Sequence, residues 1–355
     1  MQNYGGISRY FANLYNDFNS IETLSCKISM LYSENYFAEK IDHPQHIKWA
    51  KPLFGKSKSR INRWNRRYNS LMLPFADCDV FHPTYYDSYY IKKVKKPVVI
   101  TIHDMIYEKM PDFFPDSTQI INNKQRVAEH ADAIICISES AKIDLMNHLS
   151  LDESKIHVVY HGLFNSFNDE NDNLERTELP NNYVLFVGER KTYKNFIRFI
   201  EAFKNLLHKE SSLHLICAGG GSYTSAEVEL LNKYKIYNQC HQISPGDALL
   251  KQLYQKAAAF IFPSLYEGFG LPILEAFDAG CPVVMSNTNV FKEVGGHAAL
   301  YFDPYDEEDI EDKISKVLFS THQQAGMKEK GKERLKLFSA KTCVEQTIQI
   351  YKTLL

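Results

Sequence analysis

The residues best suited to chemistry lie in the segment FPSLYEGFGLPILEAFDAGCPVV, residues 262–284. Glu267 precedes a tight turn that contains Gly268 and Gly270, and Glu275 lies in the helical pattern that follows the turn. A helix N-terminus preceded by small residues binds anions, because free backbone N–H groups and the helix dipole point to the same place. A carboxylate beside a phosphate repels it unless the carboxylate turns toward hydroxyl groups, which a sugar supplies. The pattern predicts that both carboxylates flank one diphosphate-linked sugar, although either glutamate alone also fits an ordinary acidic helical turn.

A second group of chemically suitable residues is VGERKTYKNF, residues 187–196, which directly follows an apolar run. Arg190 and Lys194 would lie at the carboxyl end of that strand, where two fixed cations neutralise the charge that develops on a departing diphosphate. Such a pair replaces a metal ion, and we predict no metal site. The alternative is a solvated surface cluster of basic residues.

A third candidate is His103 in TIHDMIY, residues 101–107, at the end of a predicted strand. In a doubly wound domain this end of the strand faces the ligand side of the sheet. We therefore treat His103 as a candidate catalytic residue. The alternative is a histidine whose hydrogen bonds are satisfied locally.

The elements that must position these residues are short apolar runs separated by amphipathic stretches. Runs of four to six apolar residues rich in Val and Ile, ended by Gly, Ser or Asp, predict buried parallel strands in an α/β protein. The runs are LSCKISML (24–31), PVVITIHD (97–104), ADAIICIS (131–138), IHVVYHG (156–162), YVLFVGER (183–190), LHLICAGGG (213–221), AAFIFPS (258–264) and CPVVMS (281–286).

The length of 355 residues predicts two domains, each with its own core. The polar, Asn-rich stretch 164–182 lacks apolar periodicity and is typical of a linker. We therefore expect one domain over residues 1–165 and a second over 166–339. At the start of the chain, Gly5 and Gly6 precede an amphipathic run as in a strand-to-helix turn, but the strand that such a turn needs is missing.

The composition is that of an ordinary globular protein, with 44% hydrophobic and 24% charged residues and a formal net charge of -2. The charge provides no general attraction to nucleic acid, and no nucleic-acid-binding module is recognisable. The seven cysteines are scattered without a C-x-x-C pair, which favours a reducing compartment. Neither a signal peptide nor an apolar run of about 18 residues is present, and we expect a cytoplasmic protein.

Two weaker patterns resemble metal sites. Asp77 and Asp79 form a D-x-D match, but so short a match is common by chance. His157 and His161 are four residues apart, a spacing that suits a metal pair on a helix. They lie on a strand-like run, where residues at this spacing are too far apart to share an ion.

The segment from Lys48 to Tyr68 is strongly basic, contains no acidic residue, and holds both tryptophans, Trp49 and Trp64. Cations attract anionic headgroups and indole rings settle at the membrane interface. This composition favours peripheral association with an anionic membrane surface or a lipid diphosphate acceptor. The alternative is a solvated helix whose aromatic residues are part of the core.

Taken together, these motifs resemble the retaining glycosyltransferases of family 4, which have the GT-B fold of two Rossmann-like domains facing a cleft. The resemblance rests on the Glu267 to Glu275 spacing around EGFGLP, on GERKTYKNF, on TIHD and on the GGISRYF start. GGISRYF and YKNF are most similar to bacterial mannosyltransferase-like members. The resemblance extends over nearly the whole chain and implies that a C-terminal helix, residues 340–355, packs back on the first domain.

In the donor site that the resemblance implies, Glu267 contacts hydroxyls of the transferred sugar and Glu275 contacts the ribose. Arg190 and Lys194 hold the diphosphate. Further donor-binding contacts come from the loop before the helix, at Gly268, Phe269, Gly270 and Leu271.

From the first domain, the resemblance implies that Gly5 and Gly6 approach the donor and that His103 hydrogen-bonds the sugar. The implied activity is retaining transfer of a hexose, with mannose favoured, from a GDP- or UDP-linked donor to a glycan or polyprenyl-diphosphate-linked acceptor in surface polysaccharide synthesis. No cofactor is expected. Because the first strand is missing, a non-catalytic or impaired sugar-nucleotide-binding subunit remains an alternative, as does a phosphorylase or epimerase of the same fold.

Overall fold

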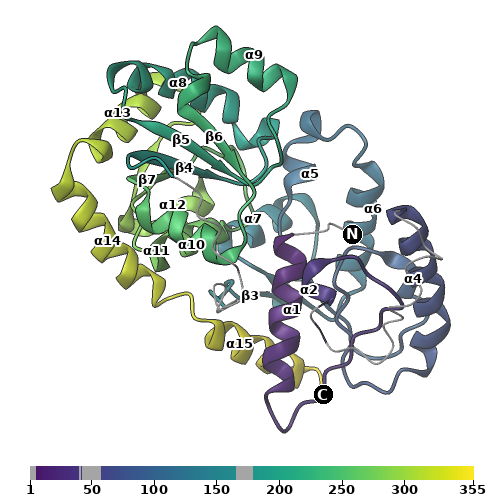
Figure 1. Cartoon of the computed structure of the whole chain (residues 1–355). Helices are drawn as coiled ribbons and strands as arrows, with labels where there is room; N and C mark the ends of the chain where they lie inside the picture. Colours follow the sequence, from purple (N-terminus) through teal and green to yellow (C-terminus); the bar gives the residue numbers. More distant parts are fainter. Residues whose placement is uncertain (1–4, 40, 42–56, 165–178) are drawn as a thin grey trace. The chain divides into compact units, whose positions relative to one another are not determined.

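The computed structural model describes residues 5–39, 41, 57–164 and 179–355 (Figure 1). The chain divides into two compact units. Unit 1 comprises Met1–His161 and Ala340–Leu355, and unit 2 comprises Gly162–Ser339. The domain boundary predicted at residues 165 and 166 lies outside the described residues.

Unit 2 contains a six-stranded sheet in which every neighbouring pair of strands is parallel. Its strands, in spatial order, are β6 (Cys240–Ile243), β5 (His214–Ala218), β4 (Tyr183–Val187), β7 (Ala259–Phe262), β8 (Val283–Ser286) and β9 (Ala299–Phe302). The chain starts in the middle at β4, adds two strands on one side, and then crosses to β7 on the other side. This is the doubly wound arrangement, and its switch point lies between β4 and β7.

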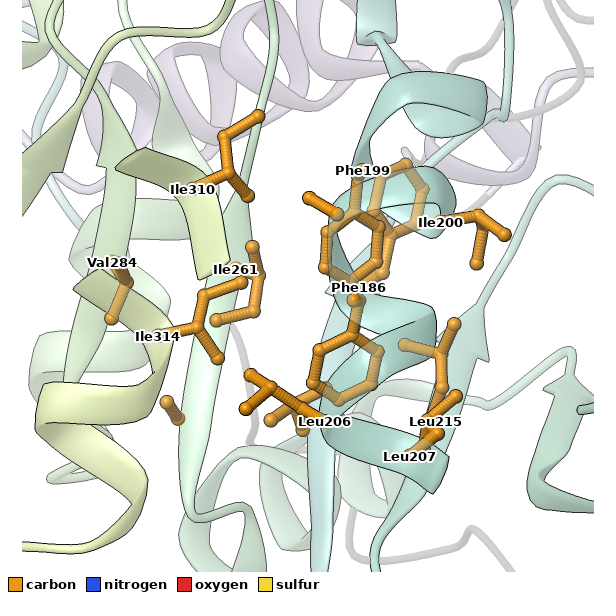
Figure 2. Close-up of a cluster of buried hydrophobic side chains, with 14 of the residues drawn as sticks. Phe186, Phe199, Ile200, Leu206, Leu207, Leu215, Ile261, Val284, Ile310 and Ile314 are labelled. Carbon is orange, nitrogen blue, oxygen red and sulfur yellow. The ribbon is translucent and has the colours of Figure 1, made fainter. Parts of the chain in front are cut away.

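The core of unit 2 forms where α8 (Phe196–Lys209) and α13 (Glu307–Leu318) pack on the sheet. Figure 2 shows Phe199 and Leu206 of α8, and Ile310 and Ile314 of α13, beside apolar side chains of the strands. Phe199 and Leu206 are seven residues apart and Ile310 and Ile314 are four apart, so each pair lies on one face of its helix. The remaining α-helices of unit 2 are α9 (Ser225–Lys233), α10 (Asp247–Lys256), α11 (Leu271–Asp278), α12 (Asn289–Gly295) and α14 (Thr321–Leu335).

In unit 1 the described residues form a three-stranded parallel sheet in the order β1 (Val99–Ile102), β2 (Ala133–Cys136) and β3 (Ile156–Val158). All residues of β1 and β2 are buried, as expected for parallel strands covered on both faces. The α-helices among the described residues of this unit are α1 (Gly6–Asn19), α2 (Tyr36–Glu39), α4 (Lys58–Met72), α5 (Ile106–Lys109), α6 (Thr118–His130), α7 (Glu139–His148) and α15 (Ala340–Thr353).

The predicted α/β class is confirmed, and one predicted strand is wrong. Residues 24–31 form no strand, whereas each of the other apolar runs contains one. The side-chain amide of Asn65 on α4 accepts the backbone N–H groups of Leu31 and Tyr32 at 2.9 and 3.0 Å and donates to the Tyr32 carbonyl at 2.7 Å. A side chain therefore provides the hydrogen bonds that a neighbouring strand would otherwise provide.

The sequence pattern also missed β6 and β9. Both are edge strands of the sheet in unit 2, and most of their residues are only partly buried. A strand that is half exposed does not need a continuous apolar run, so the pattern that identified the central strands does not identify these two.

Candidate active site

The loops that follow β4 and β7 lie side by side at the switch point of the sheet in unit 2. The two strands are paired in parallel, so their carboxyl ends lie at the same edge. The backbone N–H of Leu265, after β7, donates to the carbonyl of Tyr193, after β4, at 2.8 Å. Ligands of doubly wound sheets bind at this edge because the loops diverge at the switch point.

Lys194 and Glu267 meet at this position, although they are 73 residues apart in the sequence. The Lys194 ammonium donates to Oε1 of Glu267 at 2.5 Å, and the two side chains are 15% and 17% exposed. The ammonium also lies 5.3 Å from the ring centre of Tyr193 and 5.5 Å from that of Phe262. The structure thus places one cation and one carboxylate, both partly accessible, at the ligand edge of the sheet.

The turn between Glu267 and α11 depends on Gly270. Its φ of +109° lies in the left-handed region, and a Cβ at this position would come within 2.8 Å of Cδ1 of Ile273. Leu271 then begins α11. The Phe269 side chain is 3% exposed and packs edge-on against Phe338 at 5.7 Å. Phe269 is therefore part of the core, and only its backbone is suited to contact a ligand.

Glu275 lies one turn into α11 and is 5% exposed. The hydroxyl of Tyr254 on α10 donates to Oε2 of Glu275 at 3.2 Å. A buried carboxylate held by a hydroxyl is suited to accept further hydroxyl donors, such as those of a ribose. The position and burial of Glu275 are thus compatible with its predicted role as a ligand of the ribose, which stays a prediction.

Arg190 does not point to the pair of Lys194 and Glu267. Its Nε donates to Oε1 of Glu227 at 2.7 Å, and its side chain is 3% exposed. Its other guanidinium nitrogens donate to the carbonyls of Gly219, Gly221 and Ser222 at 2.9 to 3.1 Å. The guanidinium therefore fastens the glycine-rich loop after β5, and its role as a diphosphate ligand stays a prediction.

In unit 1, His103 follows the end of β1 and is 6% exposed. Its backbone N–H donates to the hydroxyl of Tyr86 at 3.0 Å, while Nε2 has no hydrogen-bond partner in the described part of the chain. Burial lowers the pKa of His103 well below its ordinary value, and the nearby His161, His82 and Lys124 act in the same direction. The imidazole is therefore neutral at physiological pH.

The helix that follows the Gly5-Gly6 turn packs on His103. Tyr10 of α1 lies edge-on to the His103 ring at 5.4 Å, and Phe11 lies edge-on at 5.9 Å. Unit 1 thus places α1, the helix that begins at the glycine turn predicted as a donor contact, against His103. A Cβ on Gly6 would meet nothing within 4 Å, so the fold does not require glycine at this position.

Two other histidines lie in this region, and neither was predicted to accompany His103. His161 stacks on His103 at 5.8 Å between ring centres and also contacts Tyr10 edge-on at 4.6 Å. His82 hydrogen-bonds the hydroxyl of Tyr351 on α15 through Nδ1 at 2.5 Å and that of Thr101 on β1 through Nε2 at 2.9 Å. His161 was considered only as a partner of His157, and no local motif surrounds His82, so only the fold shows that both lie near His103.

The weaker patterns have little support at their own positions. In the part of the chain that the structure describes, no three His, Cys, Asp or Glu residues gather as a metal site requires.

Residues 48–56 of the basic segment, Lys48 to Tyr68, lie outside the described residues. In α4 Trp64 is 46% exposed, so the alternative in which this aromatic residue is part of the core is wrong. None of the described helices is long and apolar enough to span a bilayer.

Comparisons with known proteins agree with this architecture. Residues 4–163 match the model of Glycosyltransferase Family 4, and residues 168–334 match that of Glycosyl transferases group 1. The crystal structure of Anabaena HepE in complex with UDP and glucose matches with a TM-score of 0.77 at 14% identity, covering 98% of this chain and 96% of HepE. The predicted GT-B fold is confirmed.

Two curated relatives are O-antigen chain mannosyltransferases. RfbU of Salmonella typhimurium is 29% identical over 221 residues, which cover 61% of this chain and 60% of RfbU. Mannosyltransferase B of Escherichia coli is 34% identical over 176 residues, which cover 48% of this chain and 46% of that protein. The chain thus spans less than two thirds of the length of each. With a family 4 domain followed by a group 1 domain over nearly its whole length, the chain belongs to the GT-B glycosyltransferases.

Proposed function

We propose that this protein transfers a hexose, with retention of configuration and without a metal ion, from a nucleotide diphosphate sugar to a glycan or lipid-linked acceptor of a surface polysaccharide. The observation that carries this proposal is the Lys194 and Glu267 pair at the switch point of the unit 2 sheet. An ammonium there is suited to a diphosphate, and a carboxylate is suited to sugar hydroxyls.

The proposed step is a front-face substitution. The bond between the anomeric carbon and the phosphate oxygen breaks while the acceptor oxygen bonds to the same face of that carbon. The proton of the acceptor hydroxyl passes to the leaving phosphate oxygen, and Lys194 stabilises the remaining negative charge. No side-chain nucleophile takes part. A covalent glycosyl adduct on Glu267, detected by mass spectrometry of the trapped enzyme, would overturn this mechanism.

Mannose is the favoured sugar because RfbU and mannosyltransferase B are both mannosyltransferases. HepE was crystallised with UDP and glucose, so GDP- and UDP-linked donors both belong in the first test. The partners that we propose are thus a nucleotide sugar and an acceptor built on a glycan or a polyprenyl diphosphate. The proposed transfer reaction needs no cofactor.

The first test is thermal stability with a panel of GDP-, UDP- and ADP-sugars, because a ligand that binds only the folded state raises the melting temperature. We expect stabilisation by one nucleotide, and loss of most of that stabilisation in Lys194→Met and Glu275→Ala. The matched control is Lys191→Met, because Lys191 is 59% exposed and pairs with Glu189, which is also exposed.

The proposal requires that the stabilising sugar nucleotide is also consumed when acceptor is present, with retained configuration in the product. Equal stabilisation of wild type and Lys194→Met by every donor would contradict the site. Stabilisation without turnover on glycan or lipid-linked acceptors would favour a binding subunit instead.

We further propose that α4 docks on an anionic membrane surface, where a lipid-linked acceptor resides. Arg60, Trp64, Arg67 and Leu71 recur at spacings of four, three and four residues and form one stripe on the helix. Trp64 and Leu71 are 46% and 71% exposed, and the Arg67 guanidinium lies 5.6 Å from the Trp64 ring centre. On another side of the helix, Asn65 holds the backbone of unit 1. The helix thus turns an amide inward and a basic, apolar stripe outward, as interfacial helices do.

Membrane docking is tested by sedimentation with phosphatidylglycerol and phosphatidylcholine vesicles. We expect binding only to the anionic vesicles, with binding weakened by salt. It should be reduced about tenfold or more in Arg60→Ser/Arg63→Ser/Arg67→Ser, since each cation near the surface contributes roughly 1 kcal/mol. The control removes three exposed lysines elsewhere in unit 1, at positions 92, 95 and 96. Equal loss in both triple variants would contradict a role for this stripe.

A further inference from the structure

Lys124 is a cation in the interior of unit 1 that the proposed reaction does not use. It lies on α6, and its side chain has no exposed surface. Moving an ammonium out of water is costly, and the cost is offset only when hydrogen bonds and an opposite charge surround it. The partners of Lys124 therefore show what the cation is placed to hold.

The ammonium is surrounded by groups from one short segment and one neighbouring tyrosine. Its Nζ donates to the carbonyl of Asp104 and to Oε2 of Glu108, both at 2.9 Å. The rings of Tyr86 and Tyr107 lie 5.1 and 5.5 Å from it. Glu108 is itself only 7% exposed, so this is a buried, hydrogen-bonded ion pair.

Two of these partners, Asp104 and Tyr86, adjoin His103. Asp104 is the next residue in the chain, and Tyr86 accepts the backbone N–H of His103 at 3.0 Å. The carboxylate of Asp104 accepts the backbone N–H of Ile106 at 3.1 Å, which shapes the turn into α5. Lys124 and Tyr86 therefore both hold the segment that follows β1.

The direction of the His103 imidazole depends on the backbone of this turn. The ring is buried, and its Nε2 has no partner among the described residues, so no side-chain hydrogen bond to that atom fixes the ring. Aromatic contacts with Tyr10 and His161 limit its rotation, but they do not fix the position of its Cα. A displacement of about 1 Å in a group that orients a substrate costs up to about 100-fold in rate.

We propose that Lys124 is a positioning residue, which holds the carbonyl of Asp104 so that His103 faces the transferred sugar. This inference rests on the proposed glycosyl transfer and on the predicted role of His103 as a group that contacts the sugar. Two apolar side chains in place of Lys124 and Glu108 would fill the same space without desolvation of charges. They would leave the Asp104 carbonyl without its donor, and the turn without its anchor.

The test removes the ion pair without leaving one charge buried. In Lys124→Met/Glu108→Met, we expect a melting temperature close to that of wild type, because paired replacement of buried charges by apolar groups is often neutral. We expect kcat to fall about tenfold or more, with KM for the donor and stabilisation by the free nucleoside diphosphate unchanged. The matched control is Lys109→Met/Asp144→Asn, which removes a more exposed ion pair at the same 2.9 Å distance, and should change none of these.

A coupling measurement separates positioning from a general structural effect. If Lys124 acts through His103, removing the ion pair in a His103→Ala background lowers kcat no further. Losses that multiply in the combined variant would overturn the proposal. An unchanged kcat in the folded Lys124→Met/Glu108→Met protein would overturn it as well.

A readout independent of catalysis is the rate at which diethyl pyrocarbonate modifies His103, measured by peptide mass spectrometry. We expect slow modification in wild type and a severalfold faster rate in Lys124→Met/Glu108→Met, with the exposed His148 unchanged. If wild type transfers no sugar from any donor, the proposed function fails while this measurement still reports on the anchor. An unchanged rate at His103 would show that Lys124 does not hold the turn.

Discussion

At the scale of single residues, the arrangement around Arg190 differs most from what its position in the sequence suggests. A cation after a central strand is well placed for an anionic ligand, but its side chain instead turns to acceptors of its own unit. Three of these acceptors are backbone carbonyls of a loop whose glycines have positive φ. Every residue has a backbone carbonyl, so a residue pattern does not show which carbonyls will accept hydrogen bonds from a side chain. The sequence therefore could not predict that the Arg190 guanidinium is bound by this loop.

Arg190→Met therefore tests whether the residue holds the loop or binds the donor. We expect the free energy of unfolding to fall by about 3 kcal/mol, because the substitution leaves Glu227 and three carbonyls without their donor. Burial acts to raise the pKa of Glu227, but hydrogen bonds from Thr224 and Arg190 outweigh it and the net pKa is lowered. Urea unfolding followed by circular dichroism measures the effect. Unchanged stability with lost donor binding would assign Arg190 to the diphosphate instead.

Lys194 and Glu267 show how far sequence reasoning reaches at this scale. Each was identified in its own motif, and the parallel order of strands explains why their loops meet. Lys124 was not identified, because a lysine in an amphipathic helix normally points to water. Its burial depends on two tyrosines and a glutamate from other segments.

At the scale of elements, the central strands could be predicted because they are buried on both faces and consist of continuous apolar runs. The edge strands β6 and β9 could not, since partial exposure permits polar residues in them. Residues 24–31 have the composition of a strand but form none. At the end of this segment the backbone is hydrogen-bonded by the side chain of Asn65 on α4 rather than by another strand. The turn before α11 was predicted correctly as a glycine-dependent helix start, and its geometry explains that requirement.

The same substitution at two glycines should have opposite effects. Gly270→Ala places a Cβ within 2.8 Å of Ile273 at a φ of +109°, so we expect a loss of about 1 to 3 kcal/mol and weaker donor binding. Gly326 lies inside α14, where a Cβ meets nothing within 4 Å, and Gly326→Ala should stabilise by about 0.5 to 1 kcal/mol. Thermal unfolding of both variants measures the difference. Equal losses at the two positions would contradict the assignment of strain to Gly270.

At the scale of the whole molecule, the two units differ in how many neutral histidines they bury. Unit 1 holds His82, His103 and His161 in one region, and burial lowers the pKa of each, to about 3 for His82 and His161. In unit 2 burial lowers the pKa of His241, and the adjacent His214 acts in the same direction. The units should therefore respond differently to acid, although each has a complete core of its own.

We expect unit 1 to lose stability steeply as the pH falls below about 6.5. In the unfolded chain these histidines take up protons near pH 6.5, whereas in the folded unit they stay neutral. The unfolded state then binds about three more protons at these positions, which lowers the free energy of unfolding by about 4 kcal/mol per pH unit between about pH 5.5 and about pH 4. The effect ends as the pH approaches about 3, where His82 and His161 are protonated in the folded unit as well. Above pH 7 the contribution is constant, because neither state binds these protons.

Tryptophan fluorescence reports on unit 1, because Trp49 and Trp64 both fall within its residue range. Urea unfolding between pH 5 and 8 should show a fluorescence transition that moves to lower urea with acid faster than the transition seen by circular dichroism. His82→Gln should lower the pH slope of the fluorescence transition by at most about one third, because it removes one of the three histidines whose pKa burial lowers most, while the half-buried His157, whose pKa burial also lowers, still contributes. The slope is the decisive quantity, since His82→Gln also disturbs the hydrogen bonds to Thr101 and Tyr351 and so lowers stability at every pH. A slope equal to that of wild type would mean that His82 is protonated in the folded unit.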